Sequence, residues 1–123
     1  MAFIERFEDI KAWQEARILT RQVYQLSNEG DLAKDFGLRD QMRRASVSAM
    51  ANIAEGFDCQ SNKEFARFLE IARRSTVEVQ SLLYTALDVG YIDDKIFNSY
   101  YEQATKTKRL TGALRAAILK QNT

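Results

Sequence analysis

The side chains best suited to specific chemistry in this chain are arginines and lysines that gather at three places. They are Arg39, Arg43 and Arg44, then Arg67, Arg73 and Arg74, and finally Lys106, Lys108, Arg109 and Arg115. The planar guanidinium of arginine matches the oxygens of a phosphate group, and lysine adds a point charge. These residues are therefore candidates for binding RNA or DNA. The alternative is that they are ordinary solvated side chains, and their spacing does not decide which of them share one surface.

Other polar side chains recur at steps of three or four residues, which keep them on one face of a helix. The first set is Gln41, Arg44, Ser48, Asn52 and Glu55, and the second is Glu64, Arg67, Arg74 and Glu78. Each set is either a solvated face or a face that meets a neighbouring subunit. The short side chain of Ser48 favours the second interpretation. Asn52 and Glu55 would then need partners such as Arg44 or Arg67, since an unpaired buried charge is costly.

Residues for catalysis or metal binding are sparse. The chain has no histidine and a single cysteine, Cys59, so neither a zinc cluster nor a Cys–His dyad can form. Its five glycines are scattered and make no phosphate-binding loop. Glu55 or Glu78 could serve as a general acid or base only if an apolar setting raised its pKa. We therefore expect no enzyme activity, no metal and no cofactor.

Charge is unevenly distributed, although the formal net charge is only +1. Residues 1–94 contain 12 Lys and Arg against 16 Asp and Glu, whereas residues 95–123 contain six against one. A basic final helix suits an anionic partner, but positive charge near a helix C-terminus also stabilises the helix dipole. One cysteine and no long apolar run predict a cytoplasmic protein that makes no use of a membrane.

Helices are the elements that must position these side chains. The chain lacks proline, and Gly30, Gly56 and Gly90 divide it into four segments with apolar residues at helical spacing. Glycine is favoured just after a helix end, so each of the three is expected to end a helix. The predicted helices cover about 9–28, 35–56, 62–89 and 94–120. Because short connections favour antiparallel neighbours, we expect residues 1–123 to form a single all-α domain, an antiparallel up-down-up-down four-helix bundle.

The apolar faces of these helices predict the core. On the second helix the face consists of Met42, Ala45, Ala49, Ile53 and Phe57. On the fourth it consists of Ile96, Tyr100, Thr107, Leu114 and Ile118.

Several motifs together resemble the four-helix-bundle family of 23S rRNA intervening-sequence proteins. They are FEDIKAWQEA at 7–16, FGLRDQMRRASVS at 36–48, NIAEGF at 52–57, EFARFLEIA at 64–72 and VGYID at 89–93. The combination spans nearly the whole chain and is more specific than any single motif. The chain departs from the family pattern at Met50, where a proline is common, and at Arg74, where a glycine is common. Arg74 is therefore expected to point outwards or to line an interface.

The resemblance implies a bundle that assembles into a homo-oligomeric ring, a homopentamer. RNA or other nucleic-acid binding is the usual inference for the family, and no member is established as catalytic. Related bundles serve as accessory proteins to the reverse transcriptase of retroelements. A protein–protein adaptor of that kind is therefore the alternative function.

Overall fold

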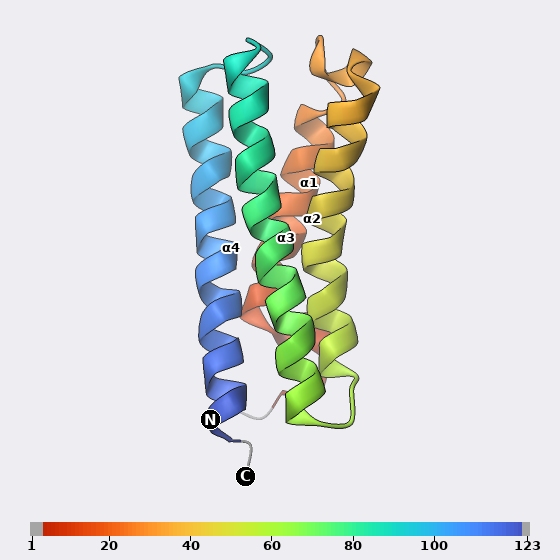
Figure 1. Ribbon diagram of the computed structural model, residues 1–123, viewed down its shortest axis with the longest axis vertical. Helices are drawn as coiled ribbons and strands as arrows, with labels where there is room; N and C mark the ends of the chain where they lie inside the picture. The colour runs from red at the N-terminus through yellow and green to blue at the C-terminus, as the bar shows by residue number, and fades with distance from the viewer. Residues whose placement is uncertain (1–3, 122–123) are drawn as a thin grey trace.

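Four long helices make up most of the structure, a computed structural model that describes residues 4–121 (Figure 1). They are α1 (Lys11–Leu26), α2 (Phe36–Phe57), α3 (Asn62–Asp88) and α4 (Asp94–Lys120). A short 3-10 helix at Phe7–Asp9 precedes α1, and another at Leu32–Lys34 lies between α1 and α2. No strand occurs within the described range. The all-α prediction is confirmed, and every predicted helix boundary lies within two residues of the observed one.

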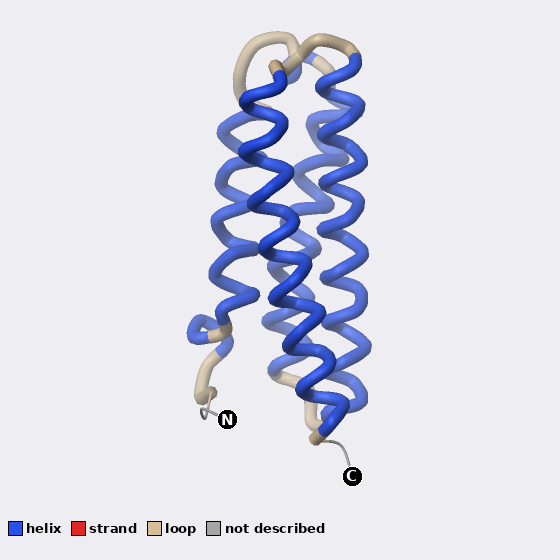
Figure 2. The backbone as a smooth tube through the Cα atoms, turned by 90° about the vertical axis from the view of Figure 1, so that its left-hand side faces the viewer, coloured by secondary structure: helices blue, strands red, loops and turns tan. Residues whose placement is uncertain are grey.

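Consecutive helices run in opposite directions. Ser48 of α2 lies beside Ser75 of α3, whereas Gly56, later on α2, lies against Phe68, earlier on α3. Later residues of α2 thus contact earlier residues of α3, which is typical of antiparallel packing. In Figures 1 and 2 the chain turns at alternate ends of the bundle, with α1 packed against both α2 and α4. The four helices therefore follow the up-down-up-down order.

Side chains and glycines fix the ends of the helices. Asp35, Ser61 and Asp93 are the N-caps of α2, α3 and α4, and each accepts a hydrogen bond from the backbone N–H three residues later, at 3.2, 3.2 and 2.8 Å. Such a cap satisfies an N–H group that the helix leaves free. After α3, Gly90 has a φ of +83°, and the N–H groups of residues 90 and 91 bond back to α3 carbonyls at 3.1 and 2.9 Å. Gly90 therefore ends its helix as predicted.

Gly56 does not end a helix, contrary to the prediction. It is buried in the last turn of α2, which continues to Phe57. A Cβ atom at Gly56 would lie 2.7 Å from the Cβ of Phe68 and 2.9 Å from a ring carbon of Phe65, both on α3. The missing side chain is what lets α2 and α3 approach each other there. The prediction failed because α2 ends one residue later, at Phe57, so Gly56 still has a helical backbone, and its φ is not positive.

Two apolar clusters fill the bundle, one toward each end. The cluster near the α1–α2 connection includes Leu19, Val23, Met42, Val79 and Leu83. The cluster near the α2–α3 connection includes Trp13, Ile53, Phe65, Leu69 and Ile118.

The predicted apolar face is confirmed for α2 from Met42 to Ile53, but it is partly wrong for α4. Ile96 is exposed, whereas Phe97, Ala104 and Thr111 are buried. Adjacent apolar residues at 96 and 97 allowed two registers for the stripe, and packing selected the second.

Candidate nucleic-acid interface

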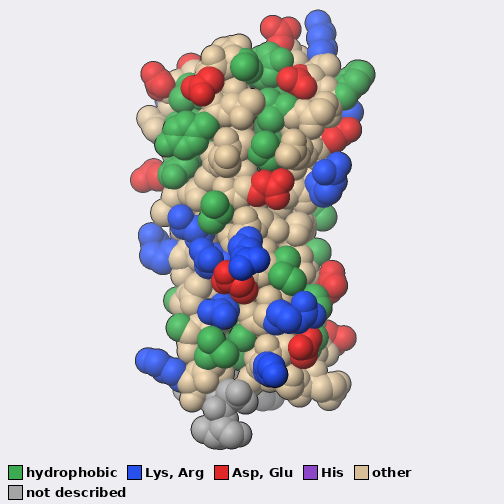
Figure 3. Space-filling model, in the orientation of Figure 1, with side chains coloured by type: hydrophobic (Ala, Val, Ile, Leu, Met, Phe, Trp, Pro, Cys, Tyr) green, Lys and Arg blue, Asp and Glu red, His purple; other side chains and the backbone are tan. Residues whose placement is uncertain are grey.

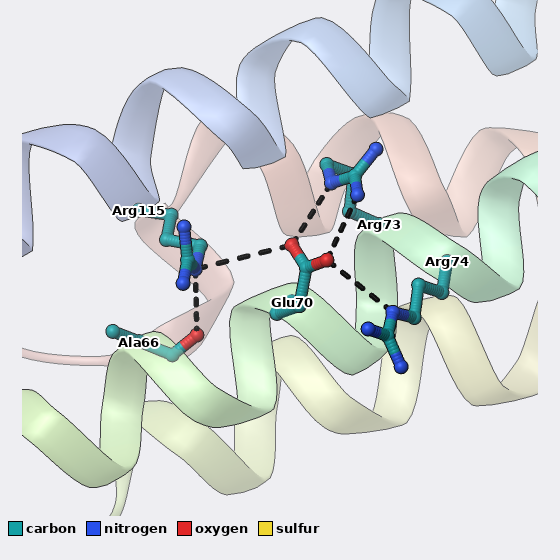
Figure 4. Close-up of polar contacts among 5 residues, drawn as sticks. All are labelled: Ala66, Glu70, Arg73, Arg74 and Arg115. Atoms are coloured by element: carbon teal, nitrogen blue, oxygen red, sulfur yellow. Dashed lines mark hydrogen bonds and ion pairs between the residues drawn. The ribbon is translucent and has the colours of Figure 1, made fainter.

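Three arginines converge on one carboxylate where α3 lies beside α4 (Figure 4). Arg73 donates two hydrogen bonds to Glu70, from Nε to Oε1 at 2.9 Å and from Nη2 to Oε2 at 2.8 Å. Arg74 donates from Nε to Oε2 at 3.3 Å. Arg115 of α4 places its Nε 3.9 Å from Oε1 and donates from the same atom to the carbonyl of Ala66 at 3.2 Å. Two arginines of α3 and one of α4 therefore surround a single carboxylate.

The cluster keeps an excess of positive charge. The hydrogen bond from Arg73, supported by the charges of Arg73, Arg115 and Arg74, lowers the pKa of Glu70 from 4.5 to about 2, against an opposing effect of desolvation. The same hydrogen bond from the other side raises the pKa of Arg73. Glu70 is therefore ionised at neutral pH. Three guanidinium groups against one carboxylate leave two positive charges in excess.

Further basic side chains flank this cluster. A groove of about 430 Å³ between α3 and α4 is lined by Lys63, Arg67, Arg74 and Arg115, with Glu64 and Glu70. On α4, Lys108 precedes Arg115 by seven residues and therefore lies on the same side of the helix. Between them, a Cβ at Gly112 would lie 3.9 Å from Cδ of Arg73, which places this side of α4 against α3.

We call this surface the basic face and define it by Lys63, Glu64, Arg67, Glu70, Arg73, Arg74, Lys108 and Arg115. Figure 3 shows blue side chains gathered over the middle and lower part of α3 and α4. The basic face holds five of the ten predicted nucleic-acid-binding residues.

The predicted residues Arg39 and Arg43 lie on a different surface, where α2 meets α1. Arg39 bonds to Asp40 at 2.9 Å, and its Cζ lies 4.6 Å from the centre of the Phe36 ring. Arg43 donates to Ser27 Oγ at 2.8 Å, and its Cζ lies 4.7 Å from the centre of the Tyr24 ring. These two arginines are therefore not part of the basic face.

Three predicted residues remain. Lys106 is turned toward α1, with its Nζ 3.6 Å from Oε1 of the buried Glu15. Arg44 and Arg109 are exposed, and neither makes an ion pair or a side-chain hydrogen bond within residues 4–121. The expected set of ten basic residues is thus distributed over several sides of the bundle.

The two sets of polar side chains predicted to lie on helix faces form a hydrogen-bond network only in part. Ser48 Oγ and Ser75 Oγ are 2.8 Å apart, and Asn52 donates to the carbonyl and hydroxyl oxygens of Ser48 at 2.8 and 3.1 Å. On α3, Arg67 bonds to Glu64 at 3.1 Å. Small polar residues therefore join α2 to α3 inside a single chain.

The other members of the two polar sets are exposed, namely Gln41, Arg44, Glu55 and Glu78. Within the chain, neither Arg44 nor Arg67 contacts Asn52 or Glu55 as an ion-pair or hydrogen-bond partner. The apolar setting considered for Glu55 or Glu78 is absent, since both side chains face solvent. Arg74 points outwards, as its departure from the family pattern led us to expect.

Sequence reasoning missed Glu70 as the centre of the basic face. Its spacing from Arg73 and Arg74 indicates local ion pairs on one helix, which are common and weak. The contact of Arg115 with Glu70 depends on how α3 and α4 pack, and the sequence of α3 alone does not predict it.

Among residues 4–121, no group of three or more His, Cys, Asp or Glu side chains could hold a metal ion. Cys59 is half-buried beyond the end of α2, and its Sγ donates to the carbonyl of Glu55 at 3.5 Å. In the same range, no helix combines the length and apolar character needed to cross a membrane.

The fold and the basic face define the class, which is an antiparallel four-helix bundle with one strongly cationic side. The family model for the 23S rRNA-intervening sequence protein matches residues 8–113, so the chain belongs to this family. The resemblance found in the sequence is confirmed.

A solved structure has the same fold. It is a crystal structure of a protein of unknown function from the S23 ribosomal protein family of Bacteroides thetaiotaomicron. The TM-score is 0.77 at 21% sequence identity, over 85% of this chain and 97% of that chain. No match was found among curated proteins.

Proposed function

We propose that this protein is a non-enzymatic, homo-oligomeric nucleic-acid-binding protein of the cytoplasm that holds the phosphates of RNA on its basic face. The observation that carries the proposal is the composition of that face, on which six Lys and Arg side chains accompany two Glu. Phosphate groups supply the main attraction in nucleic-acid binding, and guanidinium groups bind them with two parallel hydrogen bonds.

The arginines of the basic face retain donors for a phosphate. The side chain of Arg74 is 76% exposed, and only its Nε is engaged. Arg115 likewise uses Nε for both of its contacts, which leaves its two Nη groups available within the described chain. Because Glu70 restrains all three arginines, less side-chain freedom is lost when a phosphate arrives.

Self-association supports the same function. A ring, which the resemblance implies to be a homopentamer, repeats the basic face once per subunit and so multiplies the phosphate contacts. The outer side of α2 offers a surface for this association, since Val47 is exposed and is followed four residues later by the half-buried Ala51.

The experiment is purification without nuclease, followed by light scattering and identification of the co-purifying nucleic acid. We expect a particle several times the 14.2 kDa of one chain that carries RNA and releases it as salt is added. A single 14.2 kDa species would contradict the ring. A ring without bound nucleic acid, which also fails to bind added RNA at low salt, would contradict the nucleic-acid function.

The alternative function, a protein–protein adaptor such as an accessory subunit of a retroelement reverse transcriptase, is favoured by a different surface. Phe36 is 63% exposed and Tyr24 is 43% exposed, each beneath an arginine on the α1–α2 side. Aromatic and arginine side chains are enriched at protein interfaces. A protein partner that stays bound after nuclease treatment, and that no longer binds Phe36→Ser, would support the adaptor.

A further inference from the structure

Three aromatic rings lie on the same α3–α4 side as the basic face, further along toward the α3–α4 connection. The ring centres of Tyr84 and Phe97 are 4.7 Å apart, those of Tyr84 and Tyr101 are 5.8 Å apart, and those of Phe97 and Tyr101 are 5.3 Å apart. Phe97 is buried, but Tyr84 is 49% exposed. The two neighbouring rings therefore hold Tyr84 in place while leaving much of its surface open to solvent.

The aromatic group continues the basic face along the same two helices. Tyr84 follows Arg73 by eleven residues on α3, which is a distance of about 16 Å along the helix. Between them, Gln80 donates to Thr105 Oγ1 at 2.9 Å and joins α3 to α4, and Val77 is exposed. Figure 3 shows hydrophobic side chains in the upper part of this side, among several Asp and Glu side chains, and basic side chains below them beside further hydrophobic groups.

We infer that the α3–α4 side binds single-stranded nucleic acid, with phosphates on the basic face and an unpaired base stacked on Tyr84. This inference rests on the proposed function and adds that the bound strand must be unpaired. In a duplex the faces of the bases are covered by their neighbours, so only a single strand can offer one to an aromatic side chain. We call the basic face together with Tyr84 the track. One turn beyond Tyr84 lies the exposed carboxylate of Asp88, which repels phosphate and limits the track at that end.

The two parts of the track recognise different chemical groups, so they respond differently to salt. Each phosphate contact adds about 0.7 to the slope of log affinity against log salt for a single strand. Stacking adds affinity without releasing counterions, because it involves no charge. Substitution of an aromatic residue is therefore expected to weaken binding at an unchanged salt slope, and substitution of an arginine to reduce the slope.

The test measures fluorescence anisotropy with labelled RNA of about 12 nucleotides, within the range of known single-strand sites, as a single strand and as a duplex of the same sequence. Tyr84→Leu removes the aromatic face and retains an apolar side chain. The matched control is Tyr24→Leu, a similarly exposed tyrosine on the α1–α2 side. We expect Tyr84→Leu to weaken single-strand binding about fivefold or more at an unchanged salt slope, and Tyr84→Phe and Tyr24→Leu to bind as the wild type does.

Equal affinity of the wild type for single strand and duplex, or equal effects of Tyr84→Leu and Tyr24→Leu, would overturn the inference while leaving the proposed function intact. Failure of every nucleic acid to bind at low salt would overturn both. If Tyr84→Leu does not fold, cross-linking of a single strand containing 4-thiouridine to the wild type decides the question. A cross-link on the peptide with Tyr84 supports the site, and cross-links confined to other peptides contradict it. A parallel titration with single-stranded DNA separates RNA from DNA as the source of the strand.

Discussion

Replacement of Gly56 by alanine is expected to destabilise the bundle, although alanine is the better helix former. The added Cβ would lie 2.7 Å from the Cβ of Phe68, about 0.7 Å short of ordinary contact. That atom is attached directly to the backbone of α3, so it can move only if the helix moves. Separating the helices disturbs Phe65 as well, whose ring would lie 2.9 Å from the new atom.

The magnitude follows from two opposing effects. Alanine in place of glycine inside a helix stabilises it by about 1 kcal/mol, whereas overpacking of a closed interior costs about 1–3 kcal/mol. A contact this short belongs at the upper end of the second range, so we expect a net loss of about 1–2 kcal/mol. For a chain of this length the melting temperature should fall by roughly 5–10 °C.

The control is Gly112→Ala, within α4. There the nearest atom to a new Cβ is Cδ of Arg73 at 3.9 Å, which is ordinary contact. This variant should be more stable than the wild type by up to about 1 kcal/mol. Thermal and urea unfolding followed by circular dichroism, at one fixed protein concentration because association shifts stability, measures both. If Gly56→Ala is as stable as the wild type, or if the two variants change in the same direction, the close-packing role of Gly56 is refuted.

The other predictions concern caps, the seam between α2 and α3, and the basic face. Asp93→Ala removes the N-cap of α4 and should cost about 1 kcal/mol in urea unfolding; an equal loss in Asp94→Ala, which is not the cap, would contradict this assignment. Ser75→Ala leaves Ser48 without its partner on α3 and should cost about 1 kcal/mol, whereas an unchanged urea midpoint would show that this hydrogen bond contributes nothing. Folding lowers the pKa of Glu70 from 4.5 to about 2, so its ion pairs stabilise the fold above about pH 4.5 and cease to do so as the pH falls toward 2. Glu70→Gln should therefore be less stable than the wild type at pH 7 by at most about 1 kcal/mol, with the difference disappearing toward pH 2; a difference independent of pH would contradict the assignment.

Local rules predicted the starts of α2, α3 and α4 and the end of α3 because each of these has a local cause. Asp35, Ser61 and Asp93 accept hydrogen bonds from groups only three residues away, and Gly90 adopts its positive φ within the turn it closes. Gly56 shows where such rules stop. Its role depends on Phe65 and Phe68 of the next helix, and nothing in its own neighbours distinguishes a helix stop from a close contact between helices.

The candidate site was less predictable for the same physical reason. Arg67, Arg73 and Arg74 were recognisable as a basic group on one helix, but their union with Arg115 is a consequence of the packing of α3 on α4. Arg39 and Arg43 looked equivalent in the sequence, yet they stack on aromatic rings on the α1–α2 side. The sequence shows which residues are charged, whereas only the fold shows which of them lie on one surface.

The measurement that tests the central proposal most directly is the salt dependence of RNA binding by the wild type and by Arg73→Gln/Arg74→Gln/Arg115→Gln. The matched control is Arg39→Gln/Arg43→Gln, which removes two arginines from the α1–α2 side. We predict tight binding at low salt that weakens steeply as salt is added, and a control close to the wild type. In the triple variant the salt slope should be smaller by about 0.7 for each phosphate that the protein no longer binds. Binding that is absent at low salt, insensitive to salt, or unchanged in the triple variant would contradict the role of the basic face.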